Sequence, residues 1–316
     1  MICKPLSMTA VVITLQYIRS RLTIILLALI VLSAILPVFP VNAGSLKIIV
    51  VKSADLKPYQ DFLRGLRDDC GCDVQEVKFR DEEDRNNILD SHPIAVVAIG
   101  TAAFKRVRTI PDIPVIYAMV MPSEVSSPLG PNISGVSIDI SPETYLSTMK
   151  ALFPKAKRIG LIYDPRNTAP FVADAVKAAH SLGVELVTKQ LHDPSQVLGA
   201  LNEMRSKIDV LWMLPDPTVV AAQIVDYMLR FSFQNNVPIF TFSRKYVEMG
   251  AVASLDIDPY DMGAQVASIV NRISAGQAAG SSVYARKSHL AINKKMAKKL
   301  GLAIKEGSLA DVDNVD

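Results

Sequence analysis

The amino-acid sequence predicts an α/β protein with two lobes, each built on a parallel sheet that carries helices on both faces. Short β-branched runs alternate with amphipathic stretches from Lys47 onward, and this alternation is typical of parallel sheets joined by helices. The spacing also repeats, because later strands begin about 27, 47 and 66 residues after the first in one half and about 26, 51 and 80 residues after the first in the other. A chain of 316 residues, half of them hydrophobic, is long enough for two such lobes.

The first half is predicted to contain four buried strands separated by three helices. The strands are Lys47–Val51, Val74–Phe79, Ile94–Ile99 and Ile113–Ala118, and the helices are Lys57–Asp69, Asp81–Leu89 and Ala102–Val107. The second half repeats this order. Its strands are Arg158–Tyr163, Val184–Gln190, Asp209–Leu214 and Pro238–Phe242, and its helices are Thr168–Leu182, Pro194–Lys207 and Pro217–Asn235. Cap residues followed by proline mark several predicted helix starts along the chain, as in Asp193-Pro194 and Asp216-Pro217.

The chain beyond Asp258 holds more elements than the second lobe needs. One amphipathic helix is followed by a strand at His289–Ile292 and a basic helix at Lys294–Leu300. A chain that returns to the first lobe and crosses once more would use these elements, and three crossings would form a hinge. The lobes are therefore predicted to comprise residues 46–140 with 258–284, and residues 141–257 with 285–307. The acidic tail 308–316 is predicted to be frayed.

The first 43 residues have the features of a secretory signal peptide. Arg19 and Arg21 precede the apolar run Leu22–Leu36, and small residues stand before a cleavage point at Ala43. The alternative is an uncleaved membrane anchor, because the apolar stretch approaches the length that spans a bilayer. Both interpretations place the globular part outside the cytoplasm, in a periplasmic or equivalent compartment.

Charge and aromatic content argue against nucleic acid as a partner. Without the first 43 residues, 31 basic side chains balance 31 acidic ones, so no basic field remains to attract phosphates. Aromatic residues make up 6% of the chain and include a single tryptophan, which disfavours a protein that stacks single-stranded bases.

Cysteine usage does not indicate a metal site. Cys70 and Cys72 flank Gly71 without a second Cys or His pair nearby, so a local disulfide or two free thiols is favoured over zinc. Enzyme motifs are also missing: the sequence has no G-x-S-x-G, no phosphate loop and no G-x-G-x-x-G, and its four histidines are scattered. The sequence thus favours a binding protein with no catalytic residues, metal or cofactor.

Parallel α/β lobes bind ligands at the carboxyl ends of their strands, so two facing lobes would line a cleft with the loops found there. These loops carry hydroxyls, amides and carboxylates that suit a small polar ligand, and tyrosines that suit an apolar part. The candidate ligand-binding residues are Tyr59, Gly100, Thr101, Met119, Asn167, Thr168, Asp216, Thr218, Ser243 and Asp256.

Each candidate also has a purely structural interpretation. Thr101 opens a helix whose free N–H groups suit a ligand carboxylate, but it could equally act as a cap. Asn167 and Thr168 could contact the ligand from the opposite lobe or cap their own helix. Asp216 could receive a ligand ammonium or cap the residues after it, and Asp256 could serve the hinge, a ligand amine or a turn.

Four segments in order resemble one known family. They are Val96–Ala103 (VVAIGTAA), Asn132–Val136 (NISGV), Phe153–Asp164 (FPKAKRIGLIYD) and Lys298–Leu302 (KKLGL). Together they resemble the extracytoplasmic solute-binding proteins of ABC transporters of the tryptophan/tyrosine-binding type, over about Lys47 to Leu302. This resemblance implies the type I periplasmic-binding-protein fold, with two Rossmann-like lobes and three crossovers. It also implies that Thr101 meets a ligand carboxylate, with Asn167 and Asp216 in the opposite wall.

The function implied is that of the solute-binding component of an ABC importer. Such a protein is expected to be a monomer that closes by a hinge on one small ligand, an amino acid (aromatic in some members) or a related molecule, and delivers it to a membrane permease. Two alternatives remain open: a periplasmic module that senses a ligand and signals to a membrane partner, and, less favoured, an α/β isomerase.

Overall fold

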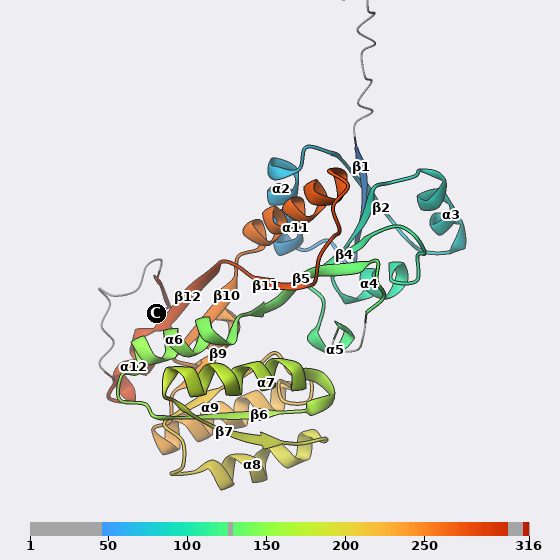
Figure 1. The fold of residues 1–316 in the computed structure, drawn as a ribbon. Helices are drawn as coiled ribbons and strands as arrows, with labels where there is room; N and C mark the ends of the chain where they lie inside the picture. Colours follow the sequence, from blue (N-terminus) through green and yellow to red (C-terminus); the bar gives the residue numbers. More distant parts are fainter. Residues whose placement is uncertain (1–45, 126–128, 303–311, 316) are drawn as a thin grey trace, which may run out of the picture. The chain divides into compact units, whose positions relative to one another are not determined.

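Two sheets organise the part of the chain that the computed structural model describes, residues 46–125, 129–302 and 312–315 (Figure 1). The signal peptide predicted over residues 1–43 lies outside the described residues. Among the residues that are described, no helix has both the length and the apolar character needed to cross a membrane.

The first sheet is entirely parallel. Its six strands lie in the order β11 (Val283–Ala285), β5 (Ile133–Ile140), β4 (Val115–Ala118), β3 (Ala95–Ile99), β1 (Lys47–Lys52) and β2 (Asp73–Val77). Helices α2 (Lys57–Asp69) and α11 (Pro259–Ser274) pack on one face, and α3 (Glu82–Asp90) and α4 (Thr101–Val107) pack on the other. A short helix, α5 (Pro122–Val125), follows β4.

The second sheet has one antiparallel pair, between β10 and β12. Its seven strands lie in the order β13 (Val312–Val315), β12 (Ser288–Asn293), β10 (Ala253–Ile257), β9 (Ile239–Thr241), β8 (Val210–Trp212), β6 (Arg158–Tyr163) and β7 (Glu185–Gln190). Helices α6 (Pro142–Leu152) and α7 (Pro165–Leu182) cover one face, and α8 (Val197–Met204), α9 (Ala222–Asn235) and α10 (Arg244–Met249) cover the other. A 3₁₀ turn at Pro194–Gln196 leads into α8, and α12 (Lys294–Lys299) follows β12.

The chain passes between the two sheets three times. It leaves the first sheet between β5 and α6, returns between β10 and α11, and leaves again between β11 and β12. This arrangement confirms the predicted fold class, with two α/β lobes, parallel sheets and three crossovers.

Several element boundaries differ from the predictions for local reasons. Helix α7 begins at Pro165 and not at Thr168, because Asp164 caps it by accepting the Arg166 N–H at 2.9 Å. The helix predicted from Pro217 begins only at Ala222. Strand β5 was not predicted, since ISGVSIDI mixes small and polar residues with apolar ones and lacks the continuous apolar character of a buried strand.

The C-terminal tail was predicted to be frayed over residues 308–316, and for its described residues this is wrong. Val312–Val315 pairs in parallel with Leu290–Asn293 of β12 and extends the second sheet. Val315 is buried among the apolar residues of that lobe, so hydrophobic burial holds the strand in place.

Cys70 and Cys72 form a disulfide at the C-terminal end of α2. The disulfide is one of the two alternatives left open for this pair. No group of three or more residues that could ligate a metal occurs in the described part of the chain.

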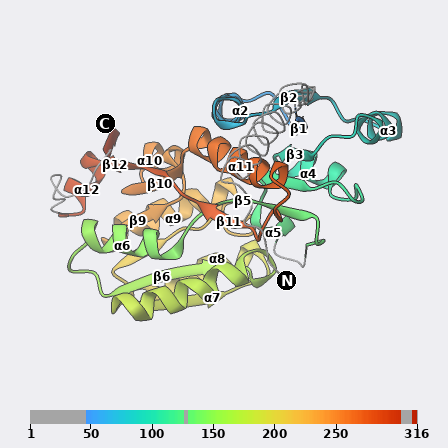
Figure 2. The same ribbon diagram turned by 45° about the horizontal axis from the view of Figure 1, so that its top comes forward.

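Helix α11 completes the first lobe by packing closely against α2, although the two are far apart in sequence (Figure 2). A Cβ atom added to Gly263 would lie 2.1 Å from the Phe62 carbonyl oxygen, and one added to Gly65 would lie 2.0 Å from the Tyr260 carbonyl oxygen. At the helix ends, Tyr260 donates to Asp68 at 2.9 Å and Asn271 donates to the Asp69 carbonyl at 3.0 Å. The two backbones therefore touch, and only glycine fits at these two positions.

We expect Gly263→Ala to destabilise the protein by about 2–3 kcal/mol, because the added methyl group must push the two helices apart. Gly199→Ala is the matched control: Gly199 lies in α8 with no atom near its missing Cβ, so alanine should raise stability by about 0.5–1 kcal/mol through helix propensity. Urea unfolding of both variants measures the difference. Equal effects of the two substitutions would contradict the close helix contact.

Candidate functional site

A pocket of about 340 Å³ lies between residues of the two lobes, within the size range of small-molecule sites. Strands β4, β5 and β11, helix α5 and the residues before β11 contribute one wall, and the first turns of α7 contribute the other. The lining residues are Tyr117, Pro122, Val125, Ser137, Asp139, Asn167, Thr168, Pro170, Phe171, Asp174, Ser282, Val283 and Tyr284.

Asp139 is the buried charged group of this pocket. It is only 6% exposed, and its carboxylate accepts one hydrogen bond from a described side chain, from the Ser137 hydroxyl at 3.2 Å. The two residues are two positions apart on β5 and so point to the same face of the sheet. Burial raises the pKa of Asp139 from its ordinary 3.8 to about 6. At neutral pH the pocket therefore contains a poorly solvated negative charge.

Aromatic side chains line the same pocket as this carboxylate. Tyr117, Phe171 and Tyr284 line the pocket, and the Phe171 and Tyr284 rings meet edge to face at a centroid distance of 6.3 Å. The Tyr284 hydroxyl donates to Asp174 of α7 at 3.4 Å. Burial, with Asp174 and Asp139 nearby, raises the pKa of Tyr284, so its phenol stays protonated and neutral. This contact links the segment before the third crossing to α7 of the second lobe.

A buried carboxylate network positions the α7 wall. Asp216 is fully buried and accepts hydrogen bonds from the Asp164 N–H and the Asn167 amide, both at 2.7 Å, and from the Thr168 hydroxyl at 3.2 Å. Thr218 joins the network by donating its N–H to Asp216 and its hydroxyl to Asp164, both at 2.9 Å. The network orients Asn167 and Thr168, which line the pocket.

The donors to Asp216 all come from its own lobe, so the geometry gives this residue a positioning role; its contact with a ligand ammonium stays a prediction. The carboxylate of Asp164 pairs with the Arg166 guanidinium, which holds the pKa of Asp164 well below its usual range.

The candidate residues of the first lobe gather at the ends of β1, β3 and β4. Gly100 has a φ of 88°, and a Cβ there would lie 2.3 Å from the Tyr59 hydroxyl. The Thr101 hydroxyl accepts the Met121 N–H at 3.0 Å, and Met119 follows β4 with a φ of 54°. None of these four candidates, Tyr59, Gly100, Thr101 and Met119, is among the pocket's described lining residues. Their contact with a ligand stays a prediction.

Ser243 and Asp256 lie together near the second crossing. Asp256 accepts the Arg244 N–H at 2.7 Å and the Ser254 hydroxyl at 2.6 Å, and the Ser243 side chain also hydrogen-bonds to it. Burial raises the pKa of Asp256. Neither Ser243 nor Asp256 is among the described lining residues of the pocket, and their ligand contact likewise stays a prediction.

Sequence reasoning found Asn167 and Thr168 of this lining but missed Asp139, Tyr117, Ser137, Phe171 and Tyr284. The signal that could have revealed Asp139 is the pattern Ser137-x-Asp139 within ISGVSIDI. A carboxylate on the inward face of a strand needs a hydrogen-bond donor or a counter-ion, and this need indicates a binding site.

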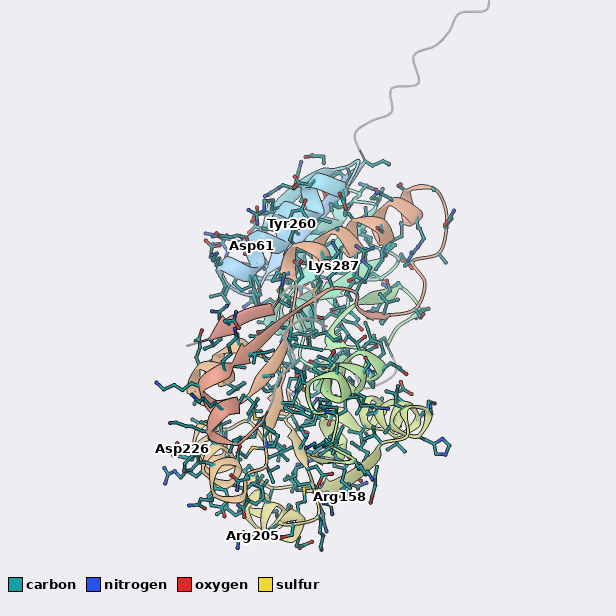
Figure 3. All side chains as sticks on the ribbon, turned by 90° about the vertical axis from the view of Figure 1, so that its left-hand side faces the viewer. Asp61, Arg158, Arg205, Asp226, Tyr260 and Lys287 are labelled. Carbon is teal, nitrogen blue, oxygen red and sulfur yellow. A yellow bond between two sulfur atoms is a disulfide. The ribbon has the colours of Figure 1, made fainter. Side chains whose placement is uncertain are left out.

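A larger pocket of about 800 Å³ occurs at the other end of the second sheet, where Arg158 and Arg205 lie near one another (Figure 3). It lies at the amino ends of β6, β8 and β9, and its acid, Asp209, is already bound by the Arg158 guanidinium at 2.8 Å. Ligands of parallel α/β lobes bind at the opposite, carboxyl ends, so the interlobe pocket is the stronger candidate.

We expect Asp139→Asn to stabilise the ligand-free protein at neutral pH by up to about 3 kcal/mol, the free energy that corresponds to a pKa raised from 3.8 to about 6. The unfolded carboxyl ionises above pH 3.8 and the folded one only above about 6, so the ionisation penalty in the wild type appears between these values as pH rises. The gain from asparagine should therefore be small at pH 4 and complete at pH 7.5.

Urea unfolding at the two pH values measures this difference. Asp226→Asn is the control, because Asp226 is exposed on α9 and pairs there with Arg230. A lower stability of Asp139→Asn at both pH values would mean that protein partners already compensate the Asp139 charge.

Three comparisons with known proteins agree. The family model described as ABC transporter substrate binding protein matches residues 76–315. The tyrosine-binding protein of Clostridioides difficile strain R20291 is 26% identical over 259 residues, which cover 76% of this chain and 74% of that protein. A conserved domain protein of Vibrio cholerae O1 biovar El Tor aligns with a TM-score of 0.59 and 25% identity over 86% of this chain and all of that one.

Two further solved structures support the fold. A ligand-free, open substrate-binding protein with adhesive properties from Clostridium difficile aligns with a TM-score of 0.65 and 20% identity, over 85% of this chain and 99% of that one. An ABC domain from Streptococcus pneumoniae in complex with L-Trp aligns with a TM-score of 0.57 and 22% identity, over 85% of this chain and all of that one. Because the family model covers about three quarters of the sequence, the chain belongs to the family of ABC transporter substrate-binding proteins.

Proposed function

We propose that this protein is the extracytoplasmic solute-binding component of an ABC importer and holds one small ligand in the pocket between its lobes. The observation that carries the proposal is Asp139, a buried carboxylate that faces a pocket lined from both lobes and has one described side-chain donor. A buried charge without a counter-ion is costly, and a ligand that brings an ammonium group would compensate it.

The ligand we propose is an amino acid, aromatic or otherwise, or a related small amine. Its ammonium would pair with Asp139, and its side chain would pack against Tyr117, Phe171 and Tyr284. The names of two similar proteins, one tyrosine-binding and one in complex with L-Trp, fit a ligand of this kind.

Closure is proposed to be a hinge motion about the three crossings, in which both lobes contribute contacts. Asp139 lies just before the first crossing and Tyr284 just before the third. A change in the angle between the lobes would therefore alter the distance from both residues to the opposite wall of the pocket. Thr101, Gly100, Tyr59 and Met119 are proposed to approach the ligand as the lobes close. The closed, loaded monomer would then deliver its ligand to a permease.

A thermal-shift screen of the purified protein against amino acids, amines, purines and small carboxylates tests this proposal. A specific ligand at a hundred times its Kd should stabilise the protein by about 2.7 kcal/mol and be recovered unchanged. Asp139→Asn should lose the shift, and Asp226→Asn should keep it. Chemical turnover of the stabilising compound, or no stabilisation by any solute, would contradict a solute-binding role.

The affinity for an ammonium ligand should fall as pH drops below about 6, because protonation of Asp139 removes the charge that the ligand pairs with. Each further pH unit should weaken binding by up to about tenfold, since only the ionised fraction binds. Isothermal titration between pH 4.5 and 8 measures this dependence. Asp139→Asn should give weak binding that does not vary over that range, and a wild-type affinity that rises in acid would exclude the pairing.

A further inference from the structure

We propose that one end of the second lobe, where the amino ends of its parallel strands lie, docks on a membrane surface that carries anionic lipids. We call this surface the basic end. It consists of α12, the last turns of α9 and α10, and the residues that line the pocket of about 800 Å³. The basic end is separate from the interlobe pocket and from the ligand proposed there.

Three helices meet at the basic end. The Met296 side chain of α12 and the Leu229 side chain of α9 lie 3.5 Å and 3.9 Å from the position of a Cβ on Gly250, the residue directly after α10. The Asn293 amide, at the start of α12, donates to a backbone carbonyl of α10 at 3.1 Å. The residues that follow α9 and α12 also line the same pocket. The three helices and the pocket therefore form one continuous surface.

Two large apolar side chains are exposed on this surface. Phe233, one turn after Leu229 on α9, is 56% exposed, the highest value among the exposed large apolar side chains of the described chain. Met249, at the end of α10, is 47% exposed. The pocket near them has further apolar residues in its lining, including Phe153 and Ile208. Exposed apolar side chains that gather beside charged ones are typical of an interaction surface.

The residues around these apolar side chains carry an excess of positive charge. Helix α12, with the sequence KKMAKK, contains four lysines and no acid. Lys155, Arg158 and Arg205 line the pocket, and the acid among its described lining residues, Asp209, is bound by Arg158. Within the described part of the chain, no hydrogen bond or ion pair engages the side chains of Lys155 and Arg205. Because basic and acidic residues balance over residues 44–316, this excess is local to the basic end.

Helix dipoles account for only part of this pattern. Basic residues near the C-terminal ends of helices stabilise the dipoles, but that role does not require an exposed phenylalanine and methionine beside them. Lys299 lies three residues after Met296, so the two share a face of α12, and Lys295 lies one turn before Lys299. Lysines that flank apolar side chains suit a membrane interface, where the apolar groups enter the headgroup region and the lysines bind lipid phosphates.

Sedimentation with lipid vesicles tests the proposal. The protein is used without residues 1–43, because their apolar run would bind lipid by itself, and every described strand and helix lies beyond them. Vesicles of phosphatidylcholine with about a third of phosphatidylglycerol should bind the protein at least about tenfold more tightly than vesicles of phosphatidylcholine alone. This difference should shrink as the salt concentration rises, because salt screens exposed charges.

Substitutions at the basic end should weaken this binding. Lys295→Gln combined with Lys299→Gln should weaken it about tenfold or more, since each basic residue near an anionic membrane contributes about fivefold. Phe233→Ser should weaken it severalfold by removing an apolar contact. The matched controls are Lys78→Gln and Leu56→Ser, at exposed positions of the first lobe, and both should bind as the wild type does. Urea unfolding of each variant checks that it is folded.

Four results would overturn the proposal. The first two are equal binding to both kinds of vesicle and undiminished binding by the folded Lys295→Gln, Lys299→Gln variant. The third is displacement by glycerol phosphate beyond that by chloride of equal ionic strength, which would indicate a site for a soluble anion. The fourth is binding of soluble polyglutamate without binding to vesicles, which would indicate an acidic protein partner. Asp139→Asn should bind vesicles as the wild type does, so none of these results bears on the proposed function.

Discussion

The site depends on the buried charge of Asp139, which has no counter-ion among the described lining residues of the pocket. Its carboxylate is buried in a pocket that three aromatic residues also line, and Ser137 is the described side chain that donates to it. Compensating such a charge from within the fold would take a cation, and the described lining offers none. The free protein therefore carries a cost that a bound cation would remove, and a binding protein can gain affinity in this way from a charge that opposes its own stability.

The topology decides where this charge lies. Asp139 is close to the end of β5, directly before the chain first leaves the first sheet, and Tyr284 lies on β11, directly before the chain leaves that sheet again. Helix α7, which supplies the opposite wall, follows the first strand of the second lobe. The pocket is thus assembled from residues near the crossings, where a change in hinge angle alters the distance between the two walls most directly.

The sequence alone predicted the order of the helices and strands, but it did not predict most of the residues that line the pocket. This difference has a physical cause. Helix Lys57–Asp69 and strand Arg158–Tyr163 were predicted with their observed bounds, because the pattern of apolar residues along a helix or a strand is a local property. The position of Asp139 in the pocket depends on β11 pairing with β5 through Val283 and Val136, which are far apart along the chain. No local pattern predicts that contact. The loops after the first, third and fourth strands were identified, but their hydroxyls bind neighbouring N–H groups, as Thr101 binds that of Met121.

Capping and recognition cannot be separated at Asp164 and Asp216. From the sequence alone, an aspartate before a proline is read either as a cap or as a ligand group, as if the two roles excluded each other. In the structure the two aspartates cap and brace the first turn of α7, and this same arrangement neutralises the positive end of the helix next to the pocket. A capping residue therefore affects which ligand charge the wall accepts, even where it touches no ligand. The Arg166 guanidinium pairs with the same Asp164 carboxylate, so the charge that this turn presents to the pocket is set by the cap together with its counter-ion.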